Sequence, residues 1–112
     1  MVRQIVWSQE ALADLVEIKD YIAQTSPQSS EAVIRAIEKS ADALITFPYS
    51  HRQVPELFDP DRRETFVHRW RLMYRILPDR IRIVGVIYGS RLLGNIDGRS
   101  FEEPTQAEYM TS

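Results

Sequence analysis

The sequence predicts an α+β domain with the element order β-α-α-β-β-β, in which a hairpin of two helices packs on one face of a small antiparallel sheet. Apolar residues recur every three or four positions across residues 12–22 and 33–45, which is the period of a helix with one buried face. Three runs typical of strands follow in the second half, separated by short turns. A chain of 112 residues, 44% of them hydrophobic, fits one domain over residues 1–112, of which 93–112 form a C-terminal tail.

The first strand is expected in VRQIVW, residues 2–7, because this short apolar run contains β-branched residues. Ser8 follows as a candidate N-cap, since its side-chain oxygen can accept a hydrogen bond from a backbone N–H of the first helical turn. The helix is expected to end near Gln24. Its apolar stripe is formed by Leu12, Leu15, Ile18 and Ile22, and the acidic residues Asp14, Glu17 and Asp20 lie off that stripe.

The second helix is predicted to begin after Ser26, a second candidate N-cap. Pro27 fits the first helical position, where a missing N–H is tolerated. The pair Phe47-Pro48 closes the helical pattern. Because the link between the two helices is so short, they should lie antiparallel as a hairpin.

Residues 48–63 contain three prolines and are expected to be irregular. Strands are predicted over 64–68, 70–77 and 80–88, with a tight turn at Pro78-Asp79, and they should form an antiparallel meander. Strict alternation along the last strand would place Ile81, Ile83 and Ile87 on one face and the residues between them on the other. Aromatic residues expected in the core are Trp7, Tyr21 and Trp70.

Arginine dominates the basic residues and is concentrated in the predicted strands. It supplies twelve of the fourteen bases, and residues 49–99 carry a net charge of +4 although the whole chain carries −2. Arginine presents a planar fork of donors that suits carboxylates and phosphates. The arginines either solvate the sheet face that the helices leave open, pairing with acids such as Glu56 and Glu64, or they meet an anionic partner. The pI of about 5.7 argues against a protein that coats nucleic acid non-specifically.

Several functional classes are excluded by composition. Without cysteine the chain has no disulfide scaffold, thiolate metal site or cysteine nucleophile. The sequence shows no metal-ligand cluster and no Gly-rich phosphate loop, so neither a metal nor a cofactor is expected. No apolar run approaches the ~20 residues of a membrane span, and the N-terminus has no signal-peptide pattern, so a cytoplasmic protein is expected.

Five local features occur in order over residues 2–93: the initial strand and helix in VWSQEALADLVEIKDYIA, ALITFP at the end of the second helix, the Arg63-Glu64 pair that opens a strand, Tyr74 to Ile76, and the closing IYGSRLL. In these features the chain resembles the RelE/ParE superfamily of type II toxin–antitoxin toxins. The order and spacing of these pieces together are more specific than any one of them.

Within the superfamily the sequence is more similar to the ParE branch. The stretch FPYSHRQVPELFDPDRRE retains the branch pattern at Pro48, Arg52 and Val54 to Glu56, whereas His51 stands where glycine is usual. Tyr88 occupies a position that is often histidine, and it is followed by Gly89 and Arg91.

The resemblance implies a fold and a choice of functions. ParE toxins inhibit DNA gyrase, RelE toxins are mRNA endonucleases that act in the ribosome, and both are neutralised by a cognate antitoxin in a hetero-oligomeric complex. We predict a ParE-like gyrase inhibitor without a hydrolytic site of its own, because lysine is scarce and the acid/base constellation is weak. The alternatives are a RelE-like ribosome-dependent endonuclease and a divergent, non-toxic member that only binds its antitoxin.

The candidate site residues follow from these alternatives. A nuclease would use Arg75 and Arg82 for the phosphate and Tyr88 as an acid, because a phenol with a pKa of ~10 is a poor base; His68 is a further candidate base. For antitoxin or target binding we predict a recognition face of arginines that pair with carboxylates: Arg69, Arg71, Arg75, Arg82, Arg91 and Arg99. The antitoxin is expected to add a strand to a sheet edge and to lay an amphipathic helix in a groove of the helix hairpin.

Overall fold

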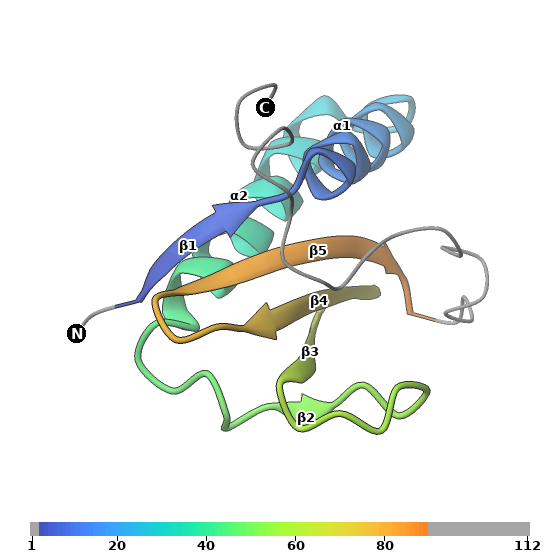
Figure 1. Ribbon diagram of the computed structural model, residues 1–112. Helices are drawn as coiled ribbons and strands as arrows, with labels where there is room; N and C mark the ends of the chain where they lie inside the picture. Colours follow the sequence, from blue (N-terminus) through green and yellow to red (C-terminus); the bar gives the residue numbers. More distant parts are fainter. Residues whose placement is uncertain (1–2, 90–112) are drawn as a thin grey trace.

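The computed structural model describes residues 3–89, which form two helices and a five-stranded sheet (Figure 1). The elements in chain order are β1 (Gln4–Trp7), α1 (Gln9–Ala23), α2 (Pro27–Ala43), β2 (Arg52–Gln53), β3 (Arg62–Val67), β4 (Trp70–Ile76) and β5 (Arg80–Tyr88). The predicted fold class and element order are confirmed. The additional element is β2, a two-residue strand inside the segment expected to be irregular.

Both helices begin at the predicted caps. The Ser8 side chain accepts a hydrogen bond from the Ala11 backbone N–H at 3.0 Å, and the Ser26 side chain accepts one from the Ser29 N–H at 3.2 Å. Pro27 occupies the first turn of α2. The second helix ends at Ala43 with Leu44 as its C-cap, before the predicted Phe47-Pro48 boundary.

The sheet has the strand order β1-β5-β4-β3-β2 and is mixed rather than wholly antiparallel. The strands β2 to β5 pair antiparallel with their neighbours, as the predicted meander requires, but β1 pairs parallel with β5. No tight turn fixes the direction of β1, because two helices and three strands lie between it and β5 in the chain. Both helices lie on one side of the sheet (Figure 1).

An irregularity in β5 changes which of its residues face the helices. The register between β4 and β5 shifts between Met73 and Tyr74, so Tyr74 pairs with Ile83 whereas Met73 pairs with Gly85. The extra residue, Val84, reverses the alternation beyond it. Val86 therefore packs with the helices and Ile87 packs on the far face, which corrects the strict alternation expected from the sequence.

The two faces of the sheet are covered differently. On the helix face, residues of both helices and of β4 and β5 form the main core, which includes Ile18, Ile37, Leu72, Tyr74 and Ile83. On the far face a smaller cluster of Val54, Met73, Val84 and Ile87 is joined by Leu57. Val54 and Leu57 come from the irregular segment between α2 and β3. We call residues 54–57 the covering segment, because they cover part of the face that was expected to stay open.

Candidate functional site

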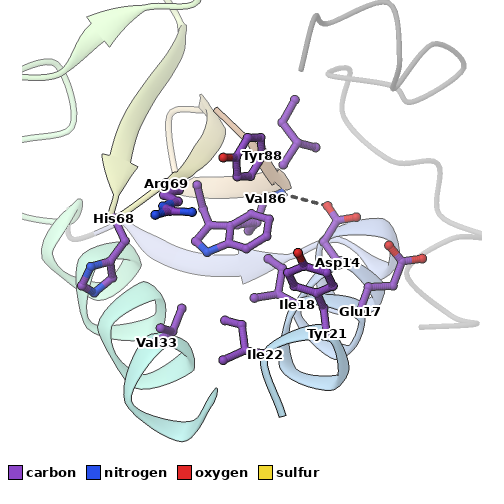
Figure 2. Close-up of a pocket in the computed structure, with 12 residues that line it drawn as sticks. Asp14, Glu17, Ile18, Tyr21, Ile22, Val33, His68, Arg69, Val86 and Tyr88 are labelled. Carbon is purple, nitrogen blue, oxygen red and sulfur yellow. Dashed lines mark hydrogen bonds between the residues drawn. The ribbon is translucent and has the colours of Figure 1, made fainter. Parts of the chain in front are cut away.

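An open groove of about 770 Å³ lies on the helix side of the sheet, at the end of β5 (Figure 2). Its floor is apolar and is formed by residues of both helices and of β4 and β5: Ile18, Ile22, Val33, Trp70 and Val86. Its rim is polar, with Asp14 and Glu17 on α1 and with His68 and Arg69 in the turn between β3 and β4. The groove therefore has an acidic wall, a basic wall and an apolar floor, which is suited to an amphipathic segment of a partner.

The acidic wall is fixed by a contact between α1 and the sheet. Asp14 is 6% exposed, and its carboxylate accepts a hydrogen bond from the Val86 backbone N–H at 2.8 Å (Figure 2). Val86 lies just beyond the irregularity in β5. The Asp14 carboxylate thus links α1 to the part of β5 that follows the irregularity. Glu17 lies one helical turn later on the same wall.

The basic wall is a tight turn held against the end of β5. His68 adopts a left-handed backbone with φ 55°, and the Arg69 carbonyl accepts a hydrogen bond from the Gly89 N–H at 2.7 Å. The rings of Trp70 and Tyr88 meet edge to face with their centroids 5.6 Å apart. These contacts hold the side chains of Arg69 and Tyr88 at the mouth of the groove (Figure 2).

On the far face, Arg71 is part of a buried network of charges. It is 4% exposed and donates from Nε to Glu64 at 2.9 Å and from Nη1 and Nη2 to Glu56 at 3.2 and 3.0 Å. Glu64 is fully buried and also pairs with Arg52. The network ties β3 and β4 to the covering segment that carries Glu56.

The electrostatics of this network favour the charged guanidinium. Burial alone would lower the pKa of Arg71, but the hydrogen bonds and charges of Glu56 and Glu64 outweigh that effect and raise it above its usual value. Arg71 therefore forms its ion pairs inside the chain. For this residue the structure agrees with the hypothesis that the arginines pair with Glu56 and Glu64, and not with the hypothesis of an anionic partner.

Further along the far face, three arginines lie side by side on adjacent strands. Arg62 of β3 pairs in register with Arg75 of β4, which pairs in register with Arg82 of β5. Arg82 is 5% exposed and Arg75 is half-buried. Cations directly opposite one another on a sheet repel, so the row favours anionic groups near it. Arg62 is 3.5 Å from Asp59, measured from Nε to a carboxylate oxygen.

The structure brings some predicted site residues together and separates others. Arg75 and Arg82 are neighbours on the far face. Tyr88 and His68 line the groove on the helix side, and Tyr88 is six residues from Arg82 along β5, roughly 20 Å. Arg69 is exposed at the groove, whereas Arg91 and Arg99 lie outside the described residues. The nuclease candidates therefore do not form one cluster within residues 3–89.

Two predictions about α1 are wrong. Tyr21 is 69% exposed, so it is a surface residue at the groove and does not belong to the core. Asp14 is buried although the sequence placed it off the apolar stripe, and Leu12 is 49% exposed. The buried stripe runs through Ala11 and Ile18, and Asp14 is one turn before Ile18. That spacing was a signal for its burial. Trp7 and Trp70 are half-buried and pack against the core.

Comparisons of the sequence with known proteins place the chain among the toxins of the RelE/ParE superfamily. The pattern of the family described as the ParE toxin of the type II toxin–antitoxin system, parDE, matches residues 5–93. Toxin RelE2 of Caulobacter vibrioides is 30% identical over 89 residues, which cover 80% of this chain and 98% of the relative.

The solved structures that share the fold include the following two. One comes from the chromosomal ParDE toxin–antitoxin system of P. aeruginosa and has a TM-score of 0.65 at 19% identity. The match covers 78% of this chain and 96% of the chain in that structure. The other is a mutant of the E. coli toxin RelE in the free state, with a TM-score of 0.59 at 14% identity, covering 80% of this chain and 86% of its own. At these identities the likeness concerns the fold.

Proposed function

Since this chain belongs to the ParE toxin family of type II toxin–antitoxin systems, we propose that it inhibits DNA gyrase by binding, without a hydrolytic site of its own. One observation supports binding over RNA cleavage. Arg75 and Arg82 lie on the far face of the sheet, whereas the acid/base candidates Tyr88 and His68 lie on the helix side. A phosphodiester cleavage site needs cations and a proton donor around one phosphate.

The proposed partner of the groove is the cognate antitoxin. An amphipathic helix of the antitoxin would bury apolar side chains on Ile22, Val33 and Trp70 and would set an acidic residue against Arg69 and a basic one against Glu17. Within the arginine row, the half-buried Arg62 and Arg75 are proposed to face the target, where carboxylates or phosphates match them, and the buried Arg82 lies beside Arg75. The two partners would then use opposite faces of the sheet.

Because the proposed target is intracellular, we expect the toxin to act in the cytoplasm. Neither described helix is long and apolar enough to cross a membrane.

A second candidate is a ribosome-dependent mRNA endonuclease, favoured by the 30% identity to Toxin RelE2. The Arg75–Arg82 pair would then contact RNA phosphates. The third possibility, a member that only binds its antitoxin, predicts binding without any effect on either target.

A gyrase assay separates these functions. Purified toxin freed from antitoxin is added to gyrase with relaxed plasmid, and supercoiling and cleaved DNA are measured. We expect supercoiling to be lost and cleaved DNA to accumulate, and we expect an equimolar amount of antitoxin to restore activity. No effect at micromolar toxin, together with codon-dependent mRNA cuts in a ribosome-containing reaction, would establish the endonuclease instead. If neither effect were seen, only antitoxin binding would be left.

A further inference from the structure

The loop between β2 and β3 displays one aromatic side chain in an unusual way. Phe58 is 90% exposed, more than the other large hydrophobic residues of the described chain. Its backbone is left-handed, with φ 52°. This conformation crowds the Cβ atom and is unfavourable for a bulky residue, so both the backbone and the exposed ring raise the free energy of the fold.

The loop is fixed on the N-terminal side of Phe58. Val54 is fully buried and Leu57 packs beside it on the far-face cluster. Between them, Glu56 is bound by Nη1 and Nη2 of Arg71 at 3.2 and 3.0 Å. The Leu57 N–H donates to the Val54 carbonyl at 3.1 Å, which closes a turn directly before Phe58.

The loop is fixed equally on the C-terminal side. The Asp59 side chain accepts a hydrogen bond from the Asp61 N–H at 2.9 Å, and the Asp59 carbonyl accepts one from the Arg62 N–H at 3.1 Å. Arg63 donates from Nε to the Pro60 carbonyl at 2.6 Å. Phe58 therefore stands between two anchored turns, and its strained conformation persists because its neighbours leave it no other.

A rigid, exposed aromatic residue is well suited to bind a partner. Its ring fills a pocket with little loss of conformational freedom on binding, and aromatic anchors dominate the binding energy of many interfaces. We propose that Phe58 is an anchor residue that inserts into an apolar pocket of the protein that this toxin inhibits. This inference rests on the proposed function in one respect, namely that the toxin acts by binding a protein.

The position of the loop favours the target over the antitoxin as the occupant. The β2–β3 loop packs on the far-face cluster, whereas the groove proposed for the antitoxin is lined in part by α1 and α2. Both helices lie on the other side of the sheet (Figure 1). The same loop leads into Arg62, the first arginine of the row proposed to face the target. Phe58 directly precedes Asp59, which pairs with Arg62, so the apolar anchor lies next to the first arginine of this row.

The test compares three variants with the wild type. Phe58→Ala removes the ring, and Phe58→Gly removes the ring and also relieves the backbone strain. Phe47→Ala is the control, because it removes another ring that is 70% exposed. Gyrase inhibition, growth arrest on induction without antitoxin, antitoxin affinity and thermal stability are measured for each. We expect both Phe58 variants to need at least about tenfold more protein for half-inhibition, as loss of a binding anchor requires. Phe58→Gly should melt no lower than the wild type. Phe47→Ala should inhibit within about twofold of the wild type, and antitoxin affinity should not change.

The outcomes separate this proposal from the proposed function. If wild-type toxin arrests growth but leaves gyrase active, gyrase is not the target, and the growth arrest caused by Phe58→Ala still tests the anchor. Growth arrest by Phe58→Ala equal to that of the wild type would overturn the anchor. A loss of antitoxin affinity with inhibition and growth arrest unchanged would overturn the anchor and would instead assign Phe58 to the antitoxin interface. If the wild type affects neither gyrase nor growth, both proposals fall.

Discussion

The two faces of the sheet show two ways of covering strands. On the helix face, α1 and α2 supply apolar side chains in a continuous layer, so the core there is made almost wholly of hydrocarbon. On the far face a short irregular segment supplies Val54 and Leu57, and the rest of the cover is the charge network of Arg71, Glu64 and Glu56. Helices can bury a whole face, whereas a loop covers part of it and must satisfy its own polar groups.

This difference separates stability from recognition. The helix face supplies most of the buried apolar area and hence most of the favourable free energy of folding. On the far face, ion pairs between arginines and carboxylates hold the covering segment in one conformation. Buried ion pairs contribute little net stability but are costly to break on one side. The far face is therefore the place where a defined loop shape can be maintained for binding.

The largest expected effect comes from breaking the far-face network at its centre. Glu64→Ala leaves Arg71 buried with one partner removed, which should lower the free energy of unfolding by about 3–5 kcal/mol. Arg52→Ala is the matched control, because the Arg52 side chain is 57% exposed and the pair should contribute only about 0–1 kcal/mol. Urea unfolding at pH 7 measures both. Equal small losses for the two variants would show that the network does not hold the far face together.

A second prediction compares the two faces directly through neighbouring residues. Leu72 and Met73 are both fully buried, but Leu72 faces the helices and Met73 faces the covering segment. Each substitution to alanine should cost about 2–5 kcal/mol, with Leu72→Ala near the upper end, because an irregular segment collapses into a cavity more readily than two packed helices do. The measurement is again urea unfolding. A larger loss for Met73→Ala would mean that the covering segment is the more rigid of the two layers.

The smallest effect concerns Tyr74, a residue of the helix-face core whose hydroxyl reaches the segment between α2 and β2. It donates to the Pro48 carbonyl at 2.7 Å, so Tyr74→Phe should cost about 1 kcal/mol at pH 7. Burial raises the pKa of Tyr74 above its ordinary value of 10.0. Its contribution is therefore fully present below about pH 10 and is lost as the pH rises further, because the unfolded tyrosine releases its proton first.

Unfolding measured between pH 8 and pH 11 checks this sign. The wild type should lose stability above about pH 10 more steeply than Tyr74→Phe does. Tyr49→Phe is the control. The hydrogen bond to Asp61, followed by burial, raises the pKa of the Tyr49 phenol, and because this phenol is exposed we expect a weaker pH dependence. Parallel pH profiles for the wild type and Tyr74→Phe would contradict the prediction.

Much of the fold was predictable because its determinants are local. Ser8 and Ser26 cap the helices as expected, and the last strand has the predicted bounds. The direction of β1 was not predictable from local signals, since its partner is more than seventy residues away. The irregularity at Val84 was also missed, although the adjacent Gly85 was a signal for it, because an isolated glycine inside a strand often marks a bulge.

The candidate site was harder to predict for the same reason. The clustering of arginines in the strands was visible in the sequence, and Arg69, Arg75 and Arg82 remain predicted binding residues. Whether a given arginine meets a partner inside the chain depends on the covering segment, which brings Glu56 to Arg71 across fifteen positions. The exposure of Phe58 had no sequence signal, because an isolated phenylalanine in a Pro-rich stretch is equally compatible with burial.

The pairing of β1 with β5 has a consequence for how the molecule is made. Gln4 lies opposite Arg80, and the Ser8 N–H donates to the Ile83 carbonyl at 3.0 Å, so the first strand finds its partner in the last described strand. Contacts between such distant positions slow folding, because a long loop must close before they form. During synthesis on the ribosome, β1 and α1 emerge well before β5. The groove and the far face of the sheet are therefore completed only when translation has passed residue 88, so a chain terminated before β5 should lack both surfaces.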